Sequence, residues 1–153
     1  MSSRGGTSRG KPKILVDTSF LLPALGVEVE KEVMEAVKEF YRFEVYYLEV
    51  SLLEAMWKIL KVAPPGVLNR VREGLVAIFE TYRQAKLPPE AYIDAYKLYR
   101  EGHRDYIDNL LYATSLRLNI PLLTVDRELI EFLKRGGYPV DNVLTPEKLK
   151  RYP

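Results

Sequence analysis

Short runs of aliphatic and β-branched residues, each ending in polar side chains, alternate along this chain with longer segments of helical periodicity. The short runs lie at residues 13–17, 42–50, 120–126 and 142–149. Apolar residues spaced three and four apart indicate helices at residues 30–40, 51–62, 65–87, 90–119 and 127–137. Apolar runs that end in polar residues are typical of buried parallel strands. The alternation therefore predicts an α/β fold built on a parallel sheet.

The length and composition fit one domain. The chain has 153 residues, 47% of them hydrophobic, which is enough to bury a core without disulfides. We predict that residues 13–150 form this domain. Residues 1–12 are Gly/Ser-rich and basic with no acid, which predicts a disordered N-terminal arm, either a phosphate-binding segment or a solubility tail.

Turn-forming residues divide the helical segments. The segment 51–62 stops before Pro64, Gly102 separates two helices within residues 90–119, and Gly136 with Gly137 closes the segment 127–137. The predicted core stripe of segment 65–87 consists of Val67, Val71, Leu75, Ile78, Phe79 and Tyr82. In the next segment Tyr92, Tyr96 and Tyr99 recur at helical spacing, which predicts core or dimer contacts.

The residue inventory favours carboxylate chemistry. The chain has no cysteine, which excludes disulfides, thiolate zinc sites and a cysteine nucleophile, and fits a reducing cytoplasm. Its single histidine, His103, argues against histidine-rich metal sites and proton relays. No apolar run approaches the length of a membrane span, and no signal peptide is visible. Asp and Glu with a hard cation are the most available means of catalysis.

Four acids occupy positions that a parallel sheet would bring together. Asp17 and Asp126 each follow a predicted strand, and Glu54 lies one helical turn after the second strand. Asp108 starts the helix that leads into the strand at residues 120–126. Because sites in parallel α/β sheets gather at the carboxyl ends of the strands, the four acids are candidates for one pocket.

Each acid also has a structural interpretation. Asp17 and Asp126 are suitable helix N-caps, and Asp105 with Asp108 would favour the macrodipole in the first turn of a helix. The sequence position of any one of these acids does not distinguish a capping role from a functional role.

The sequence does not decide which acid after the second strand belongs to the pocket, Glu54 or Glu49. Residues Ser51 to Glu54 match a capping box, in which Glu54 would bond back to the Ser51 amide. Glu49 is an alternative to Glu54, because the start of this helix is uncertain by a few residues.

The surroundings of Asp108 favour a metal site. Asp108 shares a helix face with Leu111 and Tyr112, so it points toward buried surface. Burying several unpaired carboxylates together costs several kcal/mol or forces protonation, and a divalent cation removes that penalty. Oxygen ligands without His or Cys suit Mg²⁺ or Mn²⁺ rather than zinc.

Three pieces of the sequence, in this order, resemble the PIN domain family and most closely its small VapC-type ribonucleases. They are "ILVDTSFLL", "SLLEAMWKIL" and "YIDNLLYATSLRLNIPLLTVDRELIEF". The resemblance implies a parallel five-stranded sheet flanked by helices and an acidic pocket that binds Mg²⁺ or Mn²⁺. Carried over by position, Asp17, Glu54, Asp108 and Asp126 match the four acids of the family.

The resemblance extends to residues around the acids. Ser19 and Thr124 match the family's hydroxyls, which would orient carboxylates or phosphate. Asp105 lies one turn from the third acid and would support the site without ligating metal. Asn109 departs from the small apolar residue usual after that acid, so it either contacts RNA or marks a rotated helix in which Asp105 replaces Asp108 as ligand.

The implied activity is metal-dependent endonucleolytic hydrolysis of RNA. The implied role is the toxin of a toxin–antitoxin pair, acting as a homodimer and inhibited by a small antitoxin. The alternatives are a housekeeping RNA-processing PIN nuclease and a non-catalytic PIN scaffold that binds RNA or protein. A receiver module would need adjacent acids after the first strand, and an aspartyl phosphatase would need an acid where Ser19 stands.

Overall fold

The computed structural model describes residues 10–153. The strands are β2 (Lys13–Val16), β3 (Glu44–Tyr47), β4 (Arg83–Gln84), β5 (Leu122–Leu123) and β6 (Val143–Leu144). The α-helices are α2 (Lys31–Val37), α3 (Glu49–Val62), α4 (Leu68–Thr81), α5 (Pro89–Arg100), α6 (Tyr106–Leu118), α7 (Arg127–Arg135) and α8 (Pro146–Lys150). Short 3-10 turns follow β2, precede β3 and precede α4, at η1 (Thr18–Phe20), η2 (Pro23–Leu25), η3 (Phe40–Arg42) and η4 (Pro65–Val67).

The five strands form one sheet in the order β4-β3-β2-β5-β6, and every pair is parallel. This confirms the predicted α/β class and the five-stranded sheet that the resemblance implied. The prediction of one helix over residues 65–87 is wrong, because α4 ends at Thr81 and β4 follows. Arg83 and Gln84 are exposed and pair with Tyr46 and Tyr47 at the sheet edge. Two polar residues carry no apolar alternation, so this edge strand has no sequence signal.

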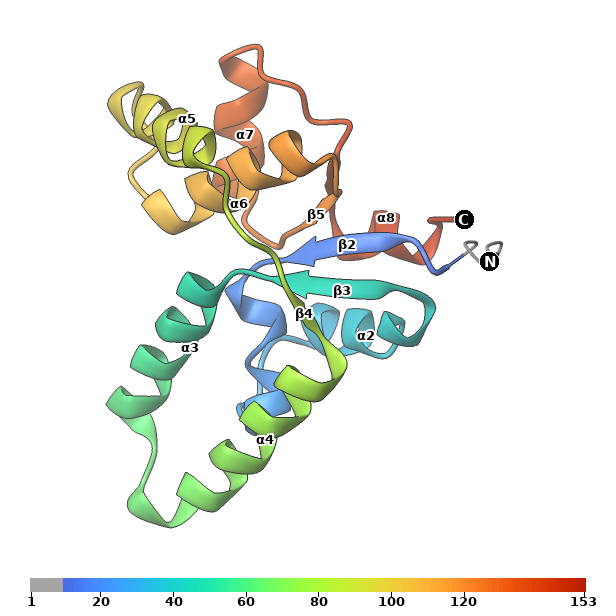
Figure 1. The fold of residues 1–153 in the computed structure, drawn as a ribbon, viewed down its shortest axis with the longest axis vertical. Helices are drawn as coiled ribbons and strands as arrows, with labels where there is room; N and C mark the ends of the chain where they lie inside the picture. Colours follow the sequence, from blue (N-terminus) through green and yellow to red (C-terminus); the bar gives the residue numbers. More distant parts are fainter. Residues whose placement is uncertain (1–9) are drawn as a thin grey trace.

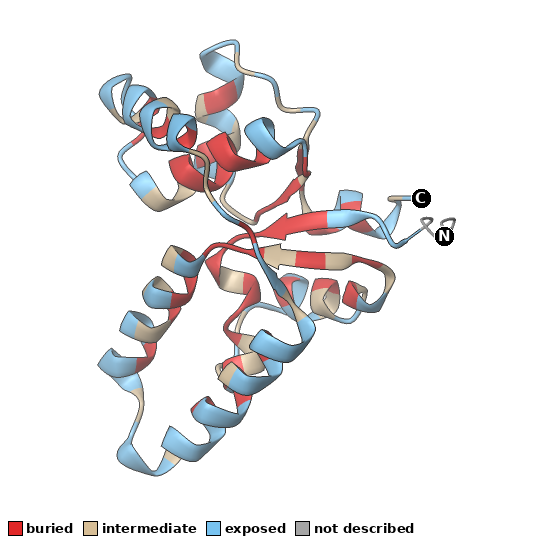
Figure 2. Ribbon diagram, in the orientation of Figure 1, coloured by how far each residue is buried: buried red, intermediate tan, exposed pale blue. Residues whose placement is uncertain are grey.

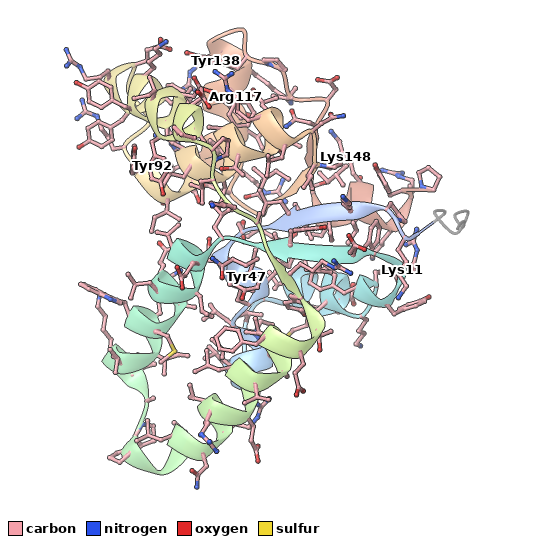
Figure 3. All side chains as sticks on the ribbon, viewed as in Figure 1. Lys11, Tyr47, Tyr92, Arg117, Tyr138 and Lys148 are labelled. Atoms are coloured by element: carbon pink, nitrogen blue, oxygen red, sulfur yellow. The ribbon has the colours of Figure 1, made fainter. Side chains whose placement is uncertain are left out.

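Strand β2 divides the hydrophobic interior into two cores, one on each face of the sheet. We call them the lower and the upper core after their places in Figure 1. Ile14 and Val16 belong to the lower core and Leu15 to the upper core, because successive side chains of a strand point to opposite faces. The lower core joins the sheet to α2, α3 and α4, and the upper core joins it to α5, α6 and α7 (Figure 1); buried positions are red in Figure 2. In Figure 3, Tyr47 lies below the sheet and Tyr138 above it.

The predicted buried face of α4 is partly wrong, and for Tyr92 and Tyr96 of α5 the core is excluded, so that dimer contacts stay a prediction. On α4 the buried residues are Val71, Gly74 and Ile78, whereas Phe79 is 60% exposed. On α5 the small residues Ala91 and Ala95 are buried with Leu98, and Tyr92 and Tyr96 lie in solvent. A hydrophobicity pattern predicts that the large apolar side chains are the buried ones. Because α5 packs closely against α6, the small alanines are buried instead.

The turn predictions hold better. Gly102 has φ +126° between α5 and α6, and Gly137 has φ +76° just after α7, conformations that favour glycine. The run at residues 142–149 is only partly a strand, because the short helix α8 follows β6 and is capped by the Thr145 hydroxyl at the Lys148 amide.

The N-terminal arm predicted for residues 1–12 lies mostly outside the described residues and stays a prediction. Among residues 10–153, no helix combines the length and the apolar content needed to span a bilayer.

Gly74 allows α4 to pack closely against η2. A Cβ at this position would lie 2.2 Å from the Ala24 carbonyl oxygen, whereas a Cβ on Gly66 would meet nothing within 4 Å. We therefore expect Gly74→Ala to lower the free energy of unfolding by about 1–3 kcal/mol through overpacking, despite the better helix propensity of alanine. Urea titration measures this change, with Gly66→Ala as the control. Equal stability of the two variants would contradict the close packing.

Candidate metal centre

Asp17 lies at the carboxyl end of β2, where it is only 5% exposed. The register pairs Val16 with Leu123, so the next residues, Asp17 and Thr124, lie side by side. The Thr124 hydroxyl and the Val125 N–H donate to Asp17 Oδ2 at 2.7 and 3.1 Å, and the Ser19 N–H donates to Oδ1 at 2.9 Å. Three donors fix the orientation of this carboxylate. Thr124 has the contact expected of it, whereas Ser19 acts through its backbone and not its hydroxyl.

Glu54 lies in the second turn of α3, and the Thr18 hydroxyl donates to its Oε1 at 2.5 Å. Glu49, the alternative acid, is exposed at the start of the helix. The predicted capping box is wrong, because α3 begins at Glu49 and Ser51 already lies inside it. Among the described residues, the buried Ser51 hydroxyl has no hydrogen-bond partner. The hydrogen bond between Thr18 and Glu54 thus connects the segment after β2 to α3.

Two further acids are helix N-caps. Asp126 accepts a hydrogen bond from the Leu129 N–H at 3.1 Å, and its own N–H donates to the Thr124 hydroxyl at 3.0 Å. Asp105 caps α6 by accepting from the Asp108 N–H at 3.1 Å. Capping and membership of the cluster are thus compatible: Asp126 caps α7 while its side chain also meets Asp108.

The sequence analysis did not include His103 among the candidate ligands, yet the structure places it beside them. One ring nitrogen of His103 and one carboxylate oxygen of each of Asp108 and Asp126 lie within 4.8 Å of one another. His103 precedes α6 and is almost fully buried. Three segments that are separate in the sequence therefore meet at one point.

Burial and crowding change the proton affinities of these acids. Burial raises the pKa of Asp17 to about 6, against the opposing effect of its three hydrogen bonds. Burial also raises the pKa of Asp108 well above its ordinary value, helped by the hydrogen bond shared with Asp126 and by the charges of Asp105, Asp126 and Asp17. Burial opposes ionisation of Asp126 too, but the hydrogen bonds from Asp108 and Leu129 lower its pKa overall. Without a cation, Asp108 keeps the proton and Asp126 keeps the charge.

Asn109 has neither of the two roles expected of it. Its side chain is fully buried and contacts His103, with 2.7 Å between Oδ1 and His103 Nδ1. Its Nδ2 donates to the His103 carbonyl at 2.8 Å and to the Ala95 carbonyl at 3.4 Å. An amide that faces His103 and α5 is not free to contact RNA. Among the described residues, Asp108 and not Asp105 lies in the group with His103 and Asp126, so Asp108 stays the predicted ligand.

The sequence analysis did not predict the contacts that Thr18, His103 and Asn109 make in the site. Thr18 stands between Asp17 and Ser19 in "VDTSF", but nothing local shows that its partner lies on α3. Asn109 had a signal, since it departs from the family pattern, and His103 had one as the only histidine. Their contact joins the connection between α5 and α6 to α6 itself. Because it does not follow a helical or strand repeat, the sequence pattern does not indicate it.

Residues 14–134 match the family model described as PIN domain. The chain belongs to the PIN domain family. No curated protein matches the chain. Among solved structures, PAE2754 from Pyrobaculum aerophilum is 17% identical with a TM-score of 0.61, and the match covers 93% of this chain and 97% of that one. This PIN domain therefore shares its fold with proteins whose sequences are very different.

Two further solved structures match similarly. A toxin–antitoxin complex from Klebsiella pneumoniae is 16% identical with a TM-score of 0.60, and the match covers 87% of this chain and 97% of that one. VapBC2 from Rickettsia felis, bound to a DNA fragment from its promoter, is 12% identical with a TM-score of 0.58, with 87% of this chain and 96% of that one covered. These likenesses concern the fold.

The donor set of this PIN domain fits a divalent cation. Carboxylate oxygens suit Mg²⁺ and Mn²⁺, and a histidine nitrogen is compatible with Mn²⁺ and later transition metals. The proton held by Asp108 marks where negative charge is uncompensated. A bound cation would replace that proton.

The raised pKa of Asp108 makes the stability of the cation-free protein depend on pH. Above pH 3.8, the ordinary value, an unfolded Asp108 loses its proton while the folded one retains it, so stability falls as pH rises. We expect Asp108→Asn to unfold like wild type near pH 4 and to be more stable by about 1–3 kcal/mol at pH 8. Urea titrations in EDTA at both pH values measure this difference, with the exposed Asp141→Asn as control. A variant less stable than wild type at pH 8 would contradict it.

Proposed function

We propose that this protein is a ribonuclease that hydrolyses RNA phosphodiester bonds internally with the help of Mg²⁺ or Mn²⁺. The observation that carries the proposal is the convergence of Asp17, Asp108 and Asp126 from three separate segments on one partly buried cluster. Charges gathered in this way lower stability, and a catalytic role explains why they are there. Membership of the PIN domain family supports the same reaction class.

The cluster supplies oriented acceptors and no protein nucleophile. When bound, a divalent cation polarises the phosphate and lowers the pKa of water. Asp17 is held in one orientation by Thr124, Val125 and Ser19, so it needs no reorganisation during the reaction. The Thr18 hydroxyl orients Glu54. We propose Asp17, Glu54, Asp108 and Asp126 as the ligands, and Thr18 and Thr124 as the groups that position them.

Two arginines near the cluster are available to an anionic polymer. Arg127 and Arg135 line an open hollow of about 400 Å³ together with His103. Glu128 and Glu131 line the same hollow, so its charge is mixed. Arg127 begins α7, directly after Asp126. Arginines beside an acidic site suit the phosphates that flank a scissile bond. We place the RNA backbone along this hollow.

Cleavage of a mixed single-stranded RNA tests the proposal. We expect cutting with Mn²⁺ or Mg²⁺, none in EDTA, and a loss of at least about 100-fold in Asp17→Asn and in Asp108→Asn, because each removes a ligand charge. Asp141→Asn, an exposed acid outside the cluster, is the matched control and should cut like wild type. Gel analysis of end-labelled RNA distinguishes internal cutting from trimming at the ends. A folded wild type that binds Mn²⁺ but leaves RNA intact would instead favour the scaffold interpretation.

We further propose that the protein is the toxin of a toxin–antitoxin pair. Two of the structural relatives are toxin–antitoxin assemblies. Helices α3 and α4 project from the sheet as two arms (Figure 1) and carry large apolar side chains in solvent. On α3 these are Leu53, Trp57 and Leu60, spaced along one helix face, and on α4 they include Val76 and Phe79.

A small protein with an apolar helix face fits this surface. Between the arms, an apolar hollow of about 240 Å³ is lined by residues including Ile59, Val62 and Val71. An amphipathic helix buries its apolar face in such a groove. The same relatives support an antitoxin as the occupant.

Trp57 is the expected anchor of that contact, because it is 61% exposed and buried tryptophans dominate interface energies. We expect Trp57→Glu to weaken binding of the small protein encoded directly upstream by at least about 30-fold while RNA cleavage is unchanged. Tyr41→Glu, at an exposed aromatic outside the arms, is the control. Calorimetry measures the binding. Absence of such a gene, or equal binding by both variants, would favour the housekeeping RNA-processing role.

A homodimer is part of the same proposal. Tyr92, Ile93 and Tyr96 are exposed together on α5, on the outside of the upper layer. A second copy would cover this apolar surface. A mass of one chain in analytical ultracentrifugation would contradict the dimer.

A further inference from the structure

We propose that Nε2 of His103 is a ligand of the divalent cation, so that this centre combines carboxylate oxygens with one nitrogen. The proposal rests on the proposed function, since it assigns a further ligand to the same site. Its starting point is the position of the His103 ring within 4.8 Å of oxygens of Asp108 and Asp126. An all-carboxylate centre has no need of an imidazole at this position.

The hydrogen bonds of Asn109 decide which ring nitrogen of His103 carries the hydrogen. The Nδ2 group of Asn109 faces two carbonyl oxygens, those of His103 and Ala95, which accept hydrogen bonds only. The amide oxygen therefore faces His103 Nδ1 at 2.7 Å, and Nδ1 must be the donor. In the neutral ring this leaves a lone pair on Nε2. Histidine ligands of metals are held in this way, with the second ring nitrogen donating to a neighbouring oxygen.

The ring is also held in place. His103 is 8% exposed, its backbone N–H donates to the Leu98 carbonyl at 3.1 Å, and its ring lies against Phe132 with 5.3 Å between centroids. Among residues 10–153, no hydrogen-bond partner faces Nε2. Asn109 is fully buried, so the support behind the ring is as rigid as the core. An oriented and nearly buried imidazole ring beside two carboxylates points to a cation between them.

The spacing is close to that of a shared ion. Two ligands at about 2.1 Å from one ion are separated by at most about 4.2 Å. The donor atoms of His103, Asp108 and Asp126 lie within 4.8 Å of one another, so small side-chain rotations bring all three within reach of one ion. Rotation of the two carboxylates about their side-chain bonds supplies such a movement.

A nitrogen ligand changes the choice of metal. Imidazole adds affinity for transition metals, whereas Mg²⁺ prefers oxygen ligands. The centre should therefore favour Mn²⁺ over Mg²⁺ more strongly than four carboxylates alone would. Removing the imidazole should reduce this preference.

Pulsed electron paramagnetic resonance of bound Mn²⁺ tests the proposal directly, because His103 is the only histidine of the chain. The protein is prepared without a histidine tag, once with ordinary histidine and once with ¹⁵N-labelled histidine, and Mn²⁺ is added alone. We expect the echo modulation of directly bound ¹⁴N in the first sample and its replacement by the ¹⁵N pattern in the second. Bound Mn²⁺ with no nitrogen coupling would overturn the proposal while leaving the ribonuclease proposal in place.

Substitution separates ligation from a structural role. His103→Asn keeps a donor close to the Nδ1 position, so the contact with Asn109 and the fold are retained, but it removes Nε2. We expect the Kd for Mn²⁺ in calorimetry to rise about 10- to 100-fold, with a smaller change for Mg²⁺, while urea titration gives wild-type stability. Asp141→Asn is the control with unchanged affinity. Equal losses for both metals, or unchanged Mn²⁺ affinity, would overturn the proposal; no Mn²⁺ binding by wild type would overturn it together with the metal-dependent activity.

Discussion

The pairing of β2 with β5 is the constraint on which the candidate centre depends. It places Asp17 beside Thr124, and the Thr124 hydroxyl donates to Asp17 while it accepts from the Asp126 N–H. One hydroxyl therefore links the end of β2, the end of β5 and the start of α7. A shift of the register by one residue would turn every side chain of the strand to the opposite face, which would move apolar residues out of both cores. The packing of the two cores thus protects the geometry of the acids.

The acids themselves oppose this packing. Asp17 and Asp108 have raised pKa values because they are buried beside other carboxylates, and the free energy of the fold bears that cost at neutral pH. The rest of the domain is built to tolerate it, with apolar side chains on both faces of the sheet. Functional sites are where proteins most often break the rule that buried charges are paired. The charge that weakens the fold is the charge that would attract a cation.

The acidic cluster and the apolar surface of α3 and α4 lie on different parts of the molecule, and we assign catalysis to the first and partner binding to the second. The acidic cluster lies where the carboxyl ends of β2 and β5 meet the starts of α6 and α7. The arms α3 and α4 leave apolar side chains in solvent, although α3 also carries Glu54 on its second turn. A partner on the arms would therefore touch the helix that carries Glu54, one of the proposed ligands. This connection would let binding at the arms affect catalysis without a long pathway.

The sequence alone determined the α/β class and the candidate acids at Asp17, Glu54, Asp108 and Asp126, because apolar runs that end in polar residues are a local signal. Their capping roles at Asp126 and Asp105 were also readable, since an N-cap and its partner lie three residues apart. Only the tertiary structure decided the contact of Thr18 with Glu54 and of His103 with Asn109. Those contacts depend on how helices are oriented against the sheet and on a bend between α5 and α6, and neither has a period in the sequence. The edge strand β4 is decided in the same way, because its two polar residues become a strand only when β3 lies beside them.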